Sequence, residues 1–107
     1  MDFKVLATDF KKAHFQFTQV KREGDVAIYK KHAIPFVSRP KAFSGGYEVI
    51  IITRHEGYAY AGVAFEPAEV YPSSEQWGSK GWTEKTLSGA EICFERVKQM
   101  LEEKSKN

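Results

Sequence analysis

A chain of 107 residues is long enough for one domain with its own core and too short for two, so we expect a single domain over residues 1–107. Its hydrophobic fraction of 42% includes no run of about 18 apolar residues, which excludes a helix that spans a membrane. The single cysteine, Cys93, excludes an intrachain disulfide, and the first residues lack the apolar segment of a signal peptide. We therefore expect a protein of a reducing compartment, the cytoplasm.

The net charge of +2 is unevenly distributed along the chain. Residues 1–60 carry ten Lys or Arg against six Asp or Glu, whereas residues 61–107 carry six against eight. A basic half can attract an anionic partner, although an ordinary solvated surface explains the same composition. Aromatic residues make up 14% of the chain, which predicts an aromatic core with some rings left partly exposed.

The N-terminal third predicts strands. Residues 3–7 alternate in a way that favours a short first strand. Aromatic and polar side chains then alternate from residue 14 onward, and the segment 21–25 is rich in turn formers. We expect a hairpin with strands at about residues 14–22 and 26–32.

The middle of the chain predicts a long loop and then the strongest strand. Residues 33–46 are basic and contain two prolines and a glycine pair, which is typical of a long loop, either functional or simply a connector. Residues 47–53 are β-branched without alternation, which predicts a central strand buried on both faces. Residues 58–71 predict one strand or two short ones, interrupted near Gly62 and Pro67.

The C-terminal part changes from irregular to helical. Residues 72–86 contain two tryptophans and two glycines, which indicates a loop attached to the body by its own rings. From Leu87 onward apolar residues follow helical spacing over about 16 residues, with either Thr86 or a Ser88–Glu91 capping box at the start. The helix must bury its apolar stripe on the sheet. The expected fold is therefore α+β, an antiparallel sheet of about four to five strands packed against one C-terminal amphipathic helix.

The predicted core combines both kinds of element. Its members are the apolar residues that face inward under these assignments, namely Phe15, Phe17, Ile28, Val49, Ile51, Phe94, Val97 and Leu101.

No pattern of catalytic or metal-binding residues is present in the sequence. Cys93 lies on the apolar stripe of the helix, where a thiol behaves as a small hydrophobic side chain. His14, His32 and His55 show no metal-ligand spacing. We expect a non-enzymatic protein without a metal or cofactor, and a small enzyme that uses His55 or His32 remains an alternative.

Basic and aromatic residues are interleaved along the predicted hairpin, the following loop and the central strand. Such interleaving is typical of proteins that bind single-stranded nucleic acid, but strands favour Tyr and Phe in any case. Trp77 and Trp82 either anchor their loop or form a hot spot for a partner. The candidate binding residues are Lys21, Arg22, Tyr29, Lys30, Lys31, His32, Arg39, Lys41, Arg54, Trp77 and Trp82.

Several segments resemble small proteins of phages and prophages. They are Gly24–Tyr29, Tyr47–Ile50 with Arg54–His55, and above all Tyr71-Pro-Ser-Ser-Glu-Gln-Trp-Gly78 with Gly81-Trp-Thr83. The resemblance implies an accessory protein made inside a bacterial cell, and it carries over no functional residue. It also makes the loop at residues 33–46 a site of specialisation, because that loop is longer than expected.

These observations favour a protein that binds a host or phage macromolecule, in one version as a stoichiometric inhibitor of a host or defence protein. The first alternative is a single-stranded nucleic-acid-binding protein. Another is a homodimer or larger homo-oligomer, in which an exposed sheet edge pairs across a two-fold axis.

Overall fold

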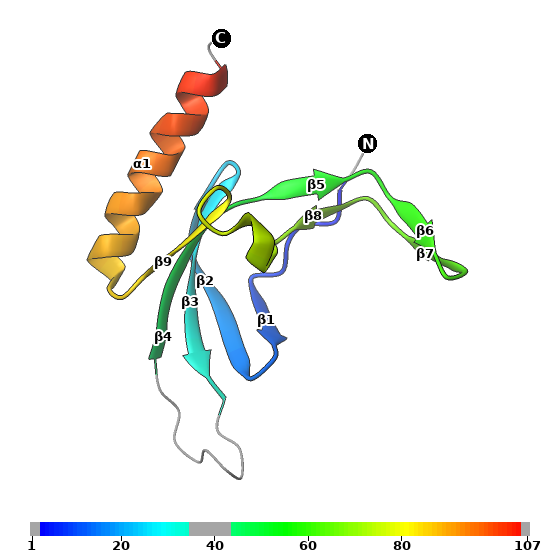
Figure 1. The fold of residues 1–107 in the computed structure, drawn as a ribbon, viewed down its shortest axis with the longest axis horizontal. Helices are drawn as coiled ribbons and strands as arrows, with labels where there is room; N and C mark the ends of the chain where they lie inside the picture. The colour runs from blue at the N-terminus through cyan, green and yellow to red at the C-terminus, as the bar shows by residue number, and fades with distance from the viewer. Residues whose placement is uncertain (1–2, 35–43, 106–107) are drawn as a thin grey trace.

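The computed structural model describes residues 3–34 and 44–105, and it shows an α+β fold. A five-stranded antiparallel sheet has the order β1-β2-β3-β4-β9, and one C-terminal helix, α1 (Leu87–Ser105), packs on it (Figure 1). The strands are β1 (Asp9–Lys12), β2 (Phe15–Glu23), β3 (Val26–Ala33), β4 (Ser44–Ile51) and β9 (Gly81–Glu84). The predicted fold class is confirmed.

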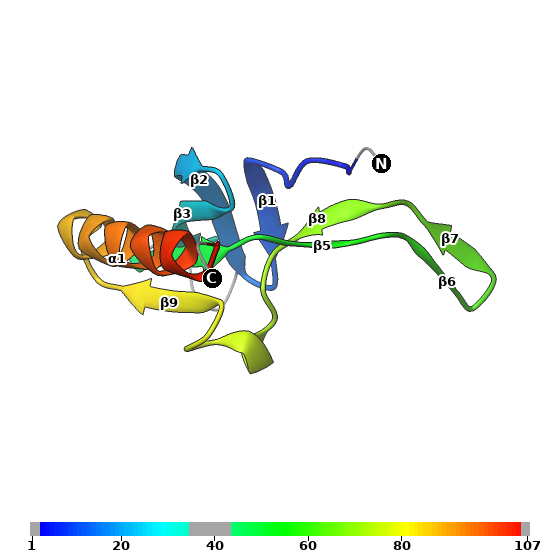
Figure 2. The same ribbon diagram turned by 90° about the horizontal axis from the view of Figure 1, so that it is seen from above.

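A two-stranded ribbon, here called the arm (residues 53–70), leaves the sheet after β4. Its inner half pairs β5 (Thr53–His55) with β8 (Ala68–Val70), and its outer half pairs β6 (Tyr58–Tyr60) with β7 (Val63–Phe65). Figures 1 and 2 show the arm extending away from α1, and the short 3₁₀ helix η1 (Ser74–Gln76) leads back to β9.

Turn chemistry explains both hairpins. In the β2–β3 hairpin Glu23 opposes Val26, so the loop has two residues, and Gly24 adopts a positive φ of 60° there. At the tip of the arm Tyr60 opposes Val63, and both Ala61 and Gly62 have positive φ angles. Two-residue hairpin loops require such angles because they match the twist of the strands.

The predicted β2–β3 hairpin is confirmed to within about one residue at each end, but four other assignments need correction. Residues 3–7 do not form the first strand, because Lys4 makes only a single bridge to Ala68 and β1 begins at Asp9. Residues 58–71 contain three short strands, β6, β7 and β8. The segment 44–46 belongs to β4, and residues 35–43 of the predicted loop lie outside the described residues. The predicted loop at residues 72–86 contains η1 and the strand β9, which pairs with the edge of β4.

Strands β3 and β4 are buried on both faces, as predicted for residues 47–53. The face covered by α1 holds a cluster of Val26, Ile28, Val49, Ile51, Ala90, Cys93, Phe94 and Val97. The opposite face holds Phe17, Ala27, Tyr29, Ile50 and Ile52. The predicted core residues are therefore divided between two clusters, with Phe15 and Leu101 only partly buried at their margins.

The start of α1 is capped by Thr86. The Gly89 backbone N–H donates to Thr86 Oγ1 at 3.0 Å, which satisfies one of the unpaired N–H groups of the first turn. The predicted capping box of Ser88 and Glu91 is not used, because the helix already begins at Leu87. Leu87 itself is 39% exposed rather than part of the buried stripe.

Replacing the cap tests this assignment. We expect Thr86→Ala to lower the free energy of unfolding by about 1 kcal/mol, because the Gly89 N–H loses its acceptor. Ser88→Ala is the matched control and should change it by less than about 0.5 kcal/mol. Urea unfolding followed by circular dichroism measures both, and a larger loss for Ser88→Ala would contradict the assignment.

Candidate functional site

Side-chain alternation places one set of aromatic and polar residues on the sheet face opposite α1. Phe17 directly opposes Lys31 across β2 and β3, and Glu48 directly opposes Thr83 across β4 and β9. Directly opposed residues point to the same face, and so do residues two apart, which adds Phe15. These five side chains line a pocket of about 530 Å³, here called the aromatic pocket.

The far wall of the aromatic pocket comes from the segment between the arm and β9. Tyr71, Pro72, Ser74 and Trp77 line it, and Lys12 and Ala13 line the end near the β1–β2 turn. The Trp77 ring leans on the backbone of β9, since a Cβ on Gly81 would lie 2.5 Å from it. Its indole N–H donates to Thr83 Oγ1 at 3.0 Å, which fixes the orientation of the ring.

A buried carboxylate and an ammonium group meet inside the aromatic pocket. Glu48 accepts a 2.6 Å hydrogen bond from the Tyr71 hydroxyl and lies 3.6 Å from Lys31 Nζ. Burial raises the pKa of Tyr71, and the neighbouring Glu48 raises it further, so the hydroxyl stays protonated as a donor. Lys31 Nζ also lies 4.3 Å from the centre of the Phe15 ring, in cation–π geometry.

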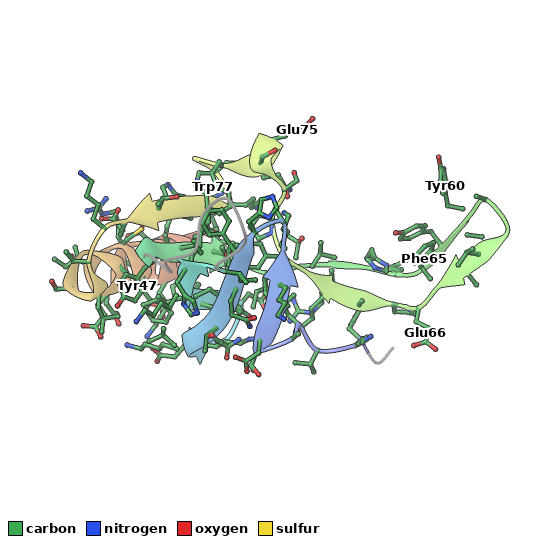
Figure 3. The ribbon with its side chains drawn as sticks, turned by 90° about the horizontal axis from the view of Figure 1, so that it is seen from below. Tyr47, Tyr60, Phe65, Glu66, Glu75 and Trp77 are labelled. Carbon is green, nitrogen blue, oxygen red and sulfur yellow. The ribbon has the colours of Figure 1, made fainter. Side chains whose placement is uncertain are left out.

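The outer half of the arm presents a second, apolar surface. Tyr58 opposes Phe65 and Tyr60 opposes Val63, so all four side chains lie on one face of the ribbon, here called the aromatic face. Tyr58 and Phe65 stack at 4.7 Å, yet the four residues are 43–73% exposed. Figure 3 shows Tyr60 on one side of the ribbon, the side toward Glu75 of η1, and Glu66 on the other.

The base of the arm is attached to the body by an ion-pair network around Glu69. Arg22 binds the Glu69 carboxylate with two hydrogen bonds of 2.8 and 2.7 Å, and Arg54 adds one of 2.9 Å. Arg54 also forms a two-bond pair with Asp25, and the Leu6 N–H donates to Glu69. The hydrogen bonds from Arg22 contribute most to lowering the pKa of Glu69 to about 2.

The structure separates the residues that the sequence grouped as one candidate surface. Lys31 and Trp77 both line the aromatic pocket, whereas Arg22 and Arg54 each form an ion pair with Glu69 at the base of the arm. The remaining candidates do not join either group. On the helix side, Lys21 covers the Phe94 ring and Trp82 packs against the buried cluster. Tyr29 is buried, His32 is half-buried and Lys30 is exposed. Arg39 and Lys41 lie outside the described residues.

Sequence reasoning missed the aromatic face of the arm and the role of Glu48. The signal for the arm was present, because residues 58–65 alternate large apolar side chains with alanine on either side of Ala61–Gly62. Glu48 carried no such signal, since a single acid within a β-branched run does not indicate a buried carboxylate.

The candidate catalytic groups lie away from the aromatic pocket. His55 packs its ring against Tyr58 and accepts the Gly57 N–H on Nδ1, and neither His55 nor His32 lines the pocket. Burial raises the pKa of Cys93, which lowers its thiolate fraction. Within residues 3–34 and 44–105, no three His, Cys, Asp or Glu side chains cluster as metal ligands would, and no helix is long and apolar enough to cross a membrane.

Comparison of the chain with protein-family models, with curated proteins and with solved structures found no match.

The pKa of Glu69 gives a prediction for acid stability. A carboxyl group whose pKa falls from 4.5 to about 2 on folding stabilises the folded state above pH 4.5, and this contribution is lost as the pH falls from 4.5 towards 2. We expect Glu69→Gln to lower the free energy of unfolding by about 2 kcal/mol at pH 7, because two arginines lose their shared anion. The difference from the native protein should shrink as the pH falls towards 2.

Urea unfolding at a series of pH values measures this difference. Glu66→Gln is the matched control, because Glu66 is exposed on the arm and forms no ion pair within the described residues. A Glu69→Gln protein as stable as the Glu66→Gln protein at pH 7 would contradict the network.

Proposed function

We propose that this protein is a non-enzymatic binding protein that engages a protein partner through the aromatic face of the arm. The observation that carries the proposal is the exposure of Tyr58, Tyr60, Val63 and Phe65 on one face of a ribbon that projects from the body. A partner from a bacterial host or a phage, bound in a stoichiometric inhibitory complex, is the version we favour.

The exposed apolar side chains of the aromatic face are grouped together, and such grouping is uncommon unless the surface binds something. Single exposed apolar residues are common, but a contiguous group typically marks an interaction site. Tyrosine supplies a large contact area at a low cost in side-chain entropy, and it dominates binding hot spots. Two of the four residues on the aromatic face are tyrosines, a composition typical of a protein interface.

The architecture of the arm also supports binding. Arg22, Arg54 and Glu69 fix its base, so less conformational entropy is lost when a partner binds to its outer half. Among the strands of residues 3–34 and 44–105, β6 and β7 pair with each other alone, which leaves the outer edge of each available to a strand of a partner.

Two substitutions on the aromatic face test the proposal. We expect Tyr60→Ser combined with Phe65→Ser to weaken binding of the partner by at least about tenfold, because hot-spot aromatics each contribute on the order of 2 kcal/mol. Since both side chains are exposed, the unfolding temperature should change little. Ile92→Ser is the matched control, because Ile92 is 64% exposed on α1, away from the arm.

Affinity capture from a lysate of the encoding cell, quantified by mass spectrometry, compares the three proteins. The proposal predicts a specific partner retained by the native and Ile92→Ser proteins and lost with the arm variant, and a 1:1 complex when the two purified proteins are mixed. Recovery of the same proteins by all three would contradict it. Light scattering that shows a native dimer and a monomeric arm variant would also contradict it, since the arm would then bind a second copy.

A further inference from the structure

The ionisable side chains that line the aromatic pocket carry more positive than negative charge. Glu48 is the acid in its lining, and its carboxylate is already bound by Tyr71 and Lys31. Lys12 also lines the pocket and forms no ion pair with any carboxylate of the described residues. Two ammonium groups against one carboxylate leave the pocket with one net positive charge.

The aromatic pocket also offers flat apolar surfaces next to that charge. Trp77 lines it from the segment after η1, and Phe15 lines it from the sheet with Lys31 over its ring. Phe17, which is 4% exposed and stacked on Phe10, forms its buried floor. The Trp77 indole N–H is satisfied by Thr83, so the ring can stack on a ligand without leaving a buried donor unpaired. Its volume of about 530 Å³ is within the range of small-molecule sites.

We propose that the aromatic pocket binds a nucleotide unit, with the base stacked on Trp77 and the phosphate bound by Lys12 and Lys31. This inference is independent of the arm and goes beyond the proposed protein binding. Stacking on aromatic rings beside basic side chains is how proteins bind single nucleotides of a strand without strong sequence preference.

The charges favour an anionic ligand over a cationic or neutral one. A cation would have to displace Lys31 from Glu48 and then approach Lys12, so it would meet repulsion from both ammonium groups. A neutral ring would stack equally well but leave Lys12 unpaired. The Lys31 ammonium has three donors, so it can bind a phosphate oxygen while it remains close to Glu48.

The fluorescence of Trp77 reports on the aromatic pocket directly. Trp82→Phe removes the only other tryptophan, on the helix side of the sheet. We expect AMP and UMP to quench this variant in a saturable way, and adenosine and inorganic phosphate to bind at least about tenfold more weakly, because each lacks one of the two contacts. No quenching by either nucleotide, or adenosine as tight as AMP, would overturn the proposal.

Isothermal titration calorimetry measures AMP binding by two matched variants, each with one lysine replaced in the otherwise native chain. Lys12→Gln should weaken AMP binding by about tenfold through loss of a charge-assisted contact. Lys11→Gln removes the same charge from the opposite face of β1 and should leave binding unchanged. Equal effects of the two substitutions would overturn the proposal, because non-specific attraction would then explain the binding.

The nucleotide unit could belong to a nucleic-acid strand or be a free nucleotide, and binding of an oligothymidylate of about eight nucleotides distinguishes these two sources. Tighter, strongly salt-dependent binding of the oligonucleotide than of a single nucleotide supports a nucleic-acid strand. Binding of AMP or UMP without binding of the oligonucleotide supports a free nucleotide. In both cases the Lys12→Gln effect must remain, and an oligonucleotide that binds equally well to the Lys12→Gln protein contradicts the site.

Discussion

Strands β3 and β4 bury alternate residues on both faces, and each face therefore needs its own cover. Val49 and Ile51 point to α1, whereas Ile50 and Ile52 point to the opposite face. Helix α1 covers the first face. On the second face, Leu6 from the N-terminal segment and Tyr71 and Trp77 from the segment after the arm pack against the cluster, beside Phe10 of β1 and Phe15 of β2. The aromatic pocket lies at the margin of this second cover, where the covering rings meet Lys31 and Glu48.

The arm follows from the same arrangement. The chain leaves the sheet after Ile52, and it must return at Tyr71 to cover the second face, so residues 53–70 form a ribbon between these two points. The base of the arm is attached to the body by Glu69 with its two arginines and by backbone hydrogen bonds of Lys4 to Pro67 and Glu69. The outer half makes its own stack of Tyr58 on Phe65 and leaves its aromatic face exposed. This separation leaves the outer half outside the core, which is why we propose it as the binding element.

The sequence predicts elements whose signals are local. The alternation around Phe17, the Gly24 turn and the helical spacing after Leu87 each depend on neighbouring residues, and they led to the correct fold class. The candidate site depended on pairings across the chain. Arg22 and Glu69 are far apart in sequence, so no local sequence pattern indicated that Arg22 forms an ion pair with Glu69 and is not available to a partner. The same holds for Glu48 and Tyr71, which define the aromatic pocket only when the sheet is assembled.

The most direct test of this account removes the outer half of the arm. His55 and Ala68 oppose each other in the inner half, so an Asn-Gly turn can replace residues 56–67 while keeping Glu69 and its partners. We predict that the thermal unfolding temperature stays within about 5 °C of the native value, because the removed residues bury little surface, and that binding of the protein partner is lost. A shortened protein that unfolds far below the native one, or that still binds the partner, would contradict the claim that the outer arm serves binding rather than folding.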